Sequence, residues 1–240
     1  VGYIGSTGAV KETNIIKCKN ASDTLSASMV GGIVGYINAQ IVNIDECSNI
    51  AKLNGSDAGG IVGRSSGTVR IKNSENRGEV TNAHAGGLIG YSYGGTITIS
   101  ESKNYANVSG GETGGIIAYA DSYSKIYIKN VENRGVIKGS YVGGICGFAS
   151  CDFEIDGAIN KGDIYCTNSG YGYLGGLIGY LVNSNANAKI YNGDNYGTLY
   201  NGANSIGGIV GYIDCMSLTM ENCNNFSESI PCSSTSSSIS

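Results

Sequence analysis

The side chains that could support catalysis or metal binding are few in this chain and are spread along its length. The sequence contains one histidine, His84, and its carboxylates recur at similar places in a repeat, with lysine and arginine interspersed. Polysaccharide lyases and glycosidases need carboxylates or a basic residue gathered on one face, whereas these carboxylates would form a solvated edge. No cysteine or histidine spacing fits a zinc site. We therefore predict no catalytic residue, no metal and no cofactor, and we interpret His84 as an incidental surface residue in a loop.

The elements that would position any such residue come from an internal repeat. A box of the form Gly-Gly-aliphatic-aliphatic-Gly recurs every 27 to 32 residues, with alanine as its last residue in one copy. Repeats of this length, each too small to bury its own apolar face, are typical of solenoids. The boxes lie at 31–35, 59–63, 86–90, 114–118, 143–147, 175–179 and 207–211.

One asparagine falls at the same place in every repeat. In a coil with one repeat per turn, equivalent residues lie about 4.8 Å apart, so each carboxamide can donate to and accept from the copies above and below. Asparagine also tolerates the left-handed conformation that a corner requires. We predict a buried asparagine ladder formed by Asn20, Asn49, Asn76, Asn104, Asn133, Asn160, Asn195 and Asn225.

The composition and the aliphatic pattern favour strands. The 39 glycines and the many Asn and Ser residues disfavour helices, whereas Ile, Val and Tyr suit strands. Three aliphatic segments recur in each repeat, one of them the box. We predict an all-β fold over residues 1–226: a three-sided parallel β-helix (β-solenoid) of about eight turns of about 28 residues, right-handed as parallel crossovers usually are. Residues 227–240 would be a Ser-rich flexible tail or linker. The insertion at 182–189 should lie on one face of the solenoid.

The residue that follows each box is aromatic in seven of eight copies. Strict strand alternation would turn one of the two aliphatic residues of each box outward, unless the glycines bend the chain. The aromatic column could be an exposed contact stripe for a glycan or a protein, or it could be a stacking ladder that stabilises the coil, and we favour the second interpretation. The column consists of Tyr3, Tyr36, Tyr91, Tyr119, Phe148, Tyr180 and Tyr212, with Arg64 as the exception.

Eight cysteines could form disulfides, since equivalent residues of neighbouring turns lie within the range that a disulfide tolerates. Cys18 and Cys47 are equivalent residues of adjacent turns and form our first expected pair. The alternative is that the thiols act as small buried hydrophobes, and Cys166 has no obvious mate. The other candidates are Cys146 with Cys151, which could bridge a bend, and Cys215, Cys223 and Cys232, which could pin the last turn.

The boxes, GGLIG at 86–90 and 175–179 above all, resemble the GLUG motif of secreted and surface proteins of bacteria and some protists. One setting of that family is the non-catalytic part of IgA-cleaving metalloproteases, but the HExxH segment of a protease is absent here, so no peptidase activity carries over. The resemblance implies an extracellular repeat module that is adhesive or structural. In a secretory pathway, Asn54 and Asn107 would be glycosylation sites, since Asn20 and Asn225 should be buried in the ladder.

The charge pattern excludes some partners. A net charge of −4 with scattered lysine and arginine offers no basic stripe for nucleic acid, and no apolar run is long enough to span a membrane. We predict a non-catalytic structural or adhesive module, secreted or displayed on a cell surface, that contacts a protein or glycan and associates end to end or side by side. The alternatives are a segment of an extracellular filament and a β-helix polysaccharide-degrading enzyme. Because the repeat is already regular at Val1, we expect a piece of a longer protein.

Overall fold

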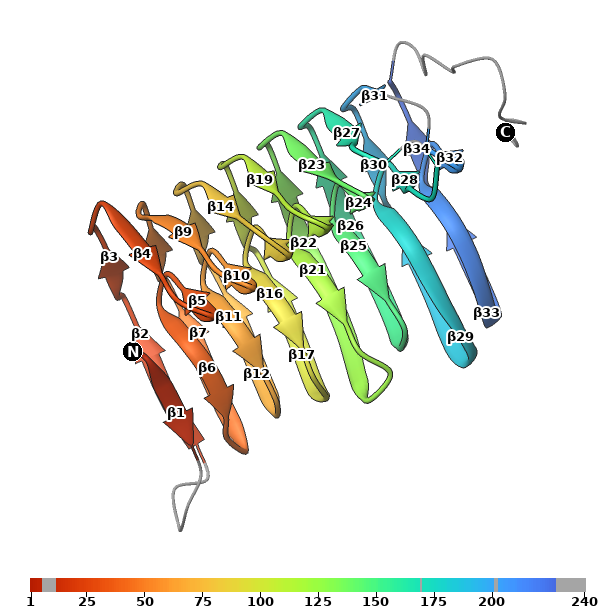
Figure 1. Cartoon of the computed structure of the whole chain (residues 1–240). Helices are drawn as coiled ribbons and strands as arrows, with labels where there is room; N and C mark the ends of the chain where they lie inside the picture. The colour runs from red at the N-terminus through yellow and green to blue at the C-terminus, as the bar shows by residue number, and fades with distance from the viewer. Residues whose placement is uncertain (6–11, 169, 201–202, 228–240) are drawn as a thin grey trace.

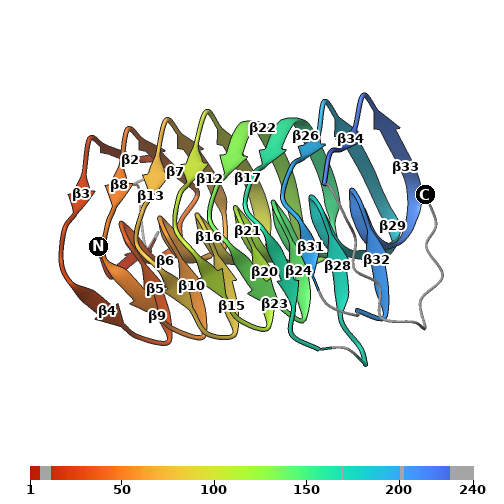
Figure 2. The ribbon, with the colours of Figure 1, turned by 90° about the horizontal axis from the view of Figure 1, so that it is seen from above.

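The computed structural model describes residues 1–5, 12–168, 170–200 and 203–227, and within them the chain forms one coil of parallel β-strands (Figure 1). No helix occurs among these residues. Figure 2 shows the successive laps lying side by side from β3 and β4 to β33. The predicted all-β, three-sided parallel solenoid is therefore confirmed. The coil makes about seven laps of about 29 residues instead of eight of 28, because the eight ladder asparagines mark the ends of seven intervals.

The largest sheet holds three successive segments of each lap. The segments that follow the boxes are β1 (Tyr3–Gly5), β6 (Val34–Asn38), β11 (Val62–Ser65), β16 (Ile89–Ser92), β21 (Ile117–Ala120), β25 (Cys146–Ala149), β29 (Ile178–Tyr191) and β33 (Val210–Glu221). The alternating strands are β2 (Glu12–Ile16), β7 (Ile41–Asp45), β12 (Thr68–Lys72), β17 (Gly95–Ser100), β22 (Ser124–Asn133) and β26 (Asp152–Asn160). The asparagine segments are β3 (Lys19–Asn20), β8 (Ser48–Asn49), β13 (Glu75–Asn76), β18 (Lys103–Asn104), β30 (Asp194–Asn195) and β34 (Asn224–Asn225).

Two seven-stranded sheets complete each lap. The second sheet contains β4 (Thr24–Ser26), β9 (Lys52–Asn54), β14 (Val80–Thr81), β19 (Val108–Ser109), β23 (Ile137–Gly139), β27 (Ile164–Cys166) and β31 (Leu199–Tyr200). The third contains β5 (Met29–Gly31), β10 (Asp57–Gly59), β15 (His84–Gly86), β20 (Glu112–Gly114), β24 (Tyr141–Gly143), β28 (Tyr173–Gly175) and β32 (Ser205–Gly207). Each Gly box therefore joins two sheets and is not one strand.

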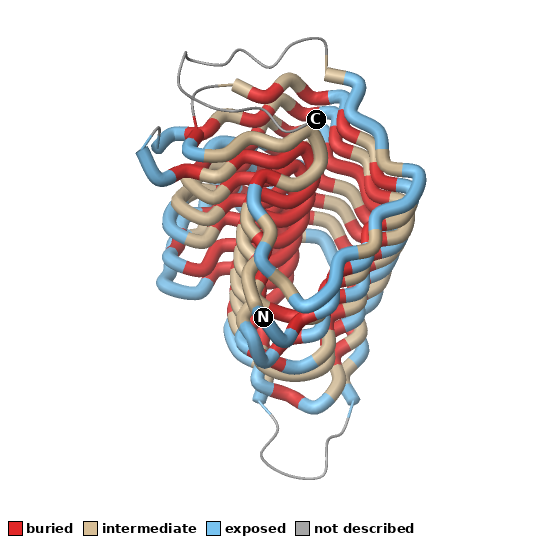
Figure 3. The backbone as a smooth tube through the Cα atoms, turned by 90° about the vertical axis from the view of Figure 1, so that its right-hand side faces the viewer, coloured by how far each residue is buried: buried red, intermediate tan, exposed pale blue. Residues whose placement is uncertain are grey.

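Both aliphatic residues of the box are buried. Leu88 and Ile89 are each fully inaccessible, as are Ile61 and Val62 one lap earlier. The backbone bends at Gly87 and Leu88, between β15 and β16, so strict alternation does not apply there. The glycine-flanked bend thus lets both side chains enter the interior, where buried residues recur at equivalent places in each lap (Figure 3).

The corner before the asparagine segment depends on another residue than the one predicted. The ladder asparagines lie in extended strands, and the left-handed residue stands three positions earlier, with φ of 52° at Glu46 and 48° at both Asn73 and Glu101. The expectation that the ladder asparagine itself makes the corner is therefore wrong. Its side chain is instead fixed inside the coil by hydrogen bonds. The full corner column is Lys17, Glu46, Asn73, Glu101, Asn130, Gly157, Asn192 and Asn222.

Candidate functional site

The asparagine ladder is formed as predicted, and its interior members use all their hydrogen-bonding capacity. Asn104 Nδ2 donates to Asn133 Oδ1 at 2.8 Å and to the carbonyl of Ala106 at 2.8 Å. Asn104 Oδ1 accepts from Asn76 Nδ2 at 3.0 Å and from the Ala106 amide at 3.3 Å. A carboxamide has two donor hydrogens and two main acceptor sites, so this buried side chain is fully satisfied. The ladder therefore ties each lap to the next.

The ladder ends differ from its interior. Asn20 is half-buried and Asn225 is exposed, so the expectation that both are buried is wrong, because no further lap is stacked on them in the described structure. Serine hydroxyls bond to them instead: Ser22 Oγ donates to Asn20 Oδ1 at 2.8 Å, and Asn225 Nδ2 donates to Ser227 Oγ at 3.1 Å. The interior laps carry alanine or glycine at this place.

The predicted aromatic column is in register along the large sheet and forms a stack. Phe148 lies between Tyr119, with ring centroids 4.5 Å apart and planes at 6°, and Tyr180, with centroids 5.3 Å apart and planes at 28°. Tyr180 and Tyr212 are 4.9 Å apart at 12°. Neighbouring rings cover both faces of Phe148, which leaves its edge toward solvent. This geometry favours the stacking ladder over a flat contact stripe.

A second outward column lies beside the first, and the sequence reasoning missed it. It belongs to the third sheet and begins two residues before each box, where register aligns Met29, Asp57, His84, Glu112, Tyr141, Tyr173 and Ser205. Tyr141 and Tyr173 stack on each other at 5.6 Å, and their rings approach Tyr180 at 5.3 Å and 4.6 Å. We call the two columns together the aromatic band. The fixed distance from each box was the signal that could have revealed the second column.

His84 occupies the polar end of this band. Its Nδ1 lies 2.8 Å from Asp57 Oδ1 in one neighbouring lap, and its Nε2 lies 3.5 Å from Glu112 Oε2 in the other. Only the protonated imidazole can donate from both nitrogens. Asp57 is nearly buried and also pairs with Arg64 at 3.4 Å. The prediction of an incidental residue in a loop is therefore wrong: His84 lies in β15, half-buried, and links three laps.

Two tyrosines of the band adjoin this polar group. Tyr91 donates from its hydroxyl to Asp121 Oδ2 at 3.1 Å, and the Arg64 guanidinium lies 4.8 Å from the Tyr91 ring centroid. Burial, followed by the nearby Asp121 carboxylate, raises the pKa of Tyr91 well above its usual value, and the same two causes raise the pKa of Tyr119. Both phenols therefore stay neutral hydrogen-bonding groups at physiological pH.

The predicted disulfides are not formed in this structure, which has free thiols at Cys18, Cys47, Cys146 and Cys151. Each of these thiols that is inside the coil packs in the core, and Cys47 Sγ and Cys146 Sγ donate to backbone carbonyl oxygens of Asp45 and Phe148 at 3.3 and 3.5 Å. The interpretation of the thiols as small hydrophobes fits these positions better. Cys215 and Cys223 are also free thiols, and Cys232 lies outside the described residues, as does the predicted tail after Ser227.

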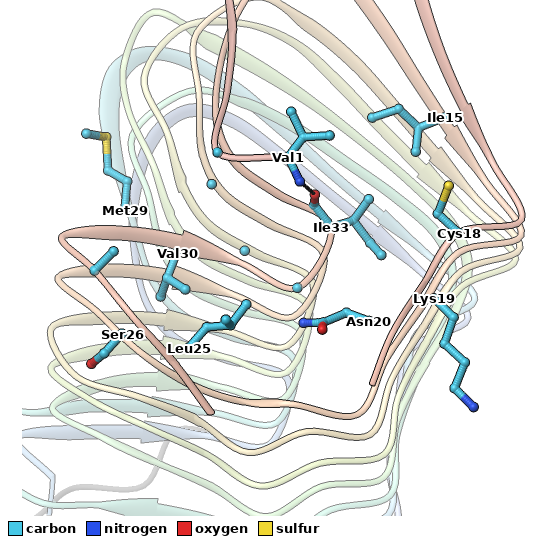
Figure 4. Close-up of a pocket in the computed structure, with 15 residues that line it drawn as sticks. Val1, Ile15, Cys18, Lys19, Asn20, Leu25, Ser26, Met29, Val30 and Ile33 are labelled. Atoms are coloured by element: carbon cyan, nitrogen blue, oxygen red, sulfur yellow. Dashed lines mark hydrogen bonds between the residues drawn. The ribbon is translucent and has the colours of Figure 1, made fainter. Parts of the chain in front are cut away.

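Two hollows occur on the described surface. The larger, of about 540 Å³, is the interior of the first lap seen from its open side, where Ile15, Leu25 and Ile33 point inward (Figure 4). The Val1 ammonium donates to the carbonyl of Ile33 there at 2.8 Å. These are core positions of the coil, so the hollow gathers no reactive groups.

The second hollow, of about 380 Å³, lies on the outer face of the large sheet. Its outward side chains are mixed in character and come from four successive laps: Tyr127, Asp152, Glu154, Asn187, Lys189 and Ser217. We call this hollow the β29 trough, because a bulge in β29 forms one wall. The carboxylates that sequence analysis assigned to a solvated edge are not among them. The insertion at 182–189 was the signal for this place.

The remaining predicted site residues stand apart from these surfaces. Asn54 and Asn107 are exposed, as a glycosylation site requires, and each accepts one hydrogen bond through Oδ1, from Asn82 and from the Val136 amide. Within the described ranges, no group of three or more His, Cys, Asp or Glu side chains is placed to hold a metal ion. The part of the chain that the structure describes also contains no helix long and apolar enough to cross a bilayer.

Comparison of the chain with protein-family models, with curated proteins and with solved structures finds no match. The resemblance to the GLUG-motif family therefore stays a prediction. Any function must be argued from the surfaces described above.

Proposed function

We propose that this chain is a non-catalytic extracellular repeat module, secreted or displayed on a cell surface, with a structural and adhesive function. The observation that carries the proposal is the unbroken asparagine ladder from Asn20 to Asn225. A buried, fully satisfied network of this kind holds neighbouring laps in one register. The coil is therefore suited to hold the aromatic band rigidly along its length.

The adhesive surface we propose is the C-terminal half of the aromatic band. Tyr141, Tyr173 and Tyr180 lie on successive laps and present ring edges and phenol groups together. Tyrosine supplies a large contact area at a low cost in conformational entropy and offers a hydroxyl for hydrogen bonding. The partner would be a protein or a glycan at a surface.

A matched pair of variants tests this surface. Replacing Tyr141 and Tyr173 with alanine removes one stacked pair from the band, whereas replacing Tyr165 and Tyr200 removes a stacked pair, 4.4 Å apart, from the second sheet. We expect retention of the purified chain on cell surfaces and immobilised glycans to fall in the first variant only. Equal retention of both variants, with unchanged circular dichroism, would contradict the assignment.

End-to-end assembly into a filament is the second candidate, favoured by the exposure of core columns on the outermost laps. Leu218 and Met220 are 40% and 38% exposed, although their equivalents one lap earlier, Ala188 and Ile190, are buried. Unpaired strand edges of this kind pair readily with another copy. Uniform long filaments in electron micrographs, abolished by Leu218→Lys, would support this candidate, and monodisperse short rods would rule it out.

A further inference from the structure

The β29 trough results from extra residues in one lap. Successive ladder asparagines are separated by 35 residues between Asn160 and Asn195, compared with 27 residues between Asn133 and Asn160. The pairing of β29 with β33 changes register between Asn183 and Asn187, so the chain bulges there. Bulges of this kind often redirect side chains next to a functional site.

The bulge is fixed to the preceding lap on both sides. Asn183 Nδ2 donates to the carbonyl of Ser150 at 2.8 Å, and the Asn187 amide donates to Asp152 Oδ1 at 3.0 Å. Ser217 Oγ of the following lap donates to Asn187 Oδ1 at 2.6 Å. The wall and the carboxylate beside it are therefore held in place before any ligand arrives, which reduces the entropy lost on binding.

The trough has one aromatic wall whose ring is not part of a stack. The register neighbours of Tyr127 are Thr98 and Glu154, so no ring of an adjacent lap covers its face, in contrast to Phe148 in the aromatic band. The Tyr127 side chain is 42% exposed. A flat, uncovered ring beside a polar hollow can pack against an apolar ligand face while its hydroxyl remains solvated.

The polar groups of the trough combine acceptors with donors. Asp152 and Glu154 point to the same face because they alternate along β26, and Lys189 Nζ lies 4.0 Å from Glu154 Oε2. Two carboxylates and one ammonium leave the trough with a net negative charge, which disfavours phosphate and other anions. Carboxylates accept only, whereas the ammonium donates only, so a ligand that satisfies both must itself carry groups that donate and accept.

We propose that the β29 trough binds a unit of a neutral carbohydrate. A sugar ring has an apolar C–H face for Tyr127 and hydroxyl groups that donate to Asp152 and Glu154 and accept from Lys189. A volume of about 380 Å³ falls within the range of small-molecule sites. The proposal rests on the proposed adhesive function and names the ligand class for one site outside the aromatic band.

Titration calorimetry of the full chain with neutral hexasaccharides of glucose, mannose, xylose and N-acetylglucosamine tests the proposal. We expect at least one of them to bind and expect Tyr127→Ala and Glu154→Gln each to weaken it by about tenfold or more. The controls are Tyr123→Ala, an exposed tyrosine outside the trough, and Glu79→Gln, whose carboxylate pairs with Lys52 at 3.9 Å on another face. Both controls should bind within about twofold of the unmodified chain.

The outcomes separate the trough from the proposed function. Absence of binding to all four sugars at millimolar concentration, or equal binding by Tyr127→Ala and the unmodified chain, would overturn the trough site. Retention of the chain on cell surfaces would in that case still support the adhesive function. Conversely, binding with cleavage of the sugar, lost in Glu154→Gln, would confirm a carbohydrate site but overturn the non-catalytic function in favour of a polysaccharide-degrading enzyme.

Discussion

Gly87 lies directly against Asn104 inside the coil. A β-carbon on Gly87 would come 2.6 Å from Asn104 Cγ and 1.9 Å from the carbonyl oxygen of Gly115 in the next lap. The same relationship joins Gly60 to Asn76 and recurs in the other laps. The two strongest repeats of the sequence, the Gly box and the asparagine column, are therefore the two sides of one contact.

Replacing Gly87 with alanine should prevent this contact. Backbone on one side and a hydrogen-bonded carboxamide on the other leave the added methyl group no space, so we expect a loss of about 3 kcal/mol or more in the free energy of unfolding. Gly170→Ala is the control, because the nearest atom to its β-carbon would be Asn168 Oδ1 at 3.8 Å. Urea unfolding followed by circular dichroism measures both, and similar midpoints would refute the steric explanation.

The position of an asparagine in the ladder should determine the cost of losing it. Asn133→Ala removes bonds to Asn104 and Asn160 on either side and leaves their buried amide groups without a partner. We expect a loss of about 3 to 5 kcal/mol, because each unsatisfied buried group costs about 1 to 3 kcal/mol. Asn225→Ala, at an exposed end, should cost about 1 kcal/mol or less. Equal losses at both positions would mean that the ladder does not act through its buried bonds.

The asparagine ladder and the aromatic column could be predicted because each keeps one residue type in almost every repeat. When type and spacing both recur, register follows directly: Asn76 pairs with Asn104, and Tyr91 with Tyr119. Alternating aliphatic residues gave the buried face of the strands for the same reason. These features report the period of the coil, which the sequence contains explicitly.

The remaining features could not be predicted because their columns mix residue types. The corner position contains Lys17, Glu46 and Asn73, which share a left-handed backbone but no chemistry. The partners of His84 are Asp57 and Glu112, 27 and 28 residues away, and only the register of the third sheet brings them together. The β29 trough depends on how an insertion bulges, which a repeat pattern does not specify.

The corner column offers a stabilising substitution. Glu46 has a φ of 52°, which costs a residue with an ordinary side chain about 1 kcal/mol, whereas asparagine tolerates this conformation better. Glu46→Asn should therefore raise the free energy of unfolding by about 0.5 kcal/mol, even though it removes an exposed ion pair with Lys17 at 3.7 Å. Glu79→Asn removes a comparable exposed charge where the backbone has no positive φ, and it should give no gain. A melting temperature that rises equally in both variants would point to charge, and not to the backbone, as the cause.

The buried thiols predict a loss of stability at alkaline pH. Burial raises the pKa of Cys151 to about 12 and raises the pKa of Cys146 well above its usual value, whereas both thiols have ordinary values near 9 when unfolded. The folded state therefore keeps protons that the unfolded state releases. This contribution to stability is complete below about pH 9 and is lost progressively as the pH rises toward the folded values.

Urea unfolding at neutral pH and at several values above pH 9 measures this loss, and Cys151→Ala should make the decrease shallower. Some decrease should remain, because the buried Tyr91 phenol also has a raised pKa. Thiol labelling gives an independent readout: exposed Cys18 should react in the folded chain, whereas Cys151, which is 1% exposed, should react only after unfolding. Rapid labelling of Cys151 in the folded chain, or an unchanged decrease in Cys151→Ala, would show that its thiol is not held in the dry interior of the coil.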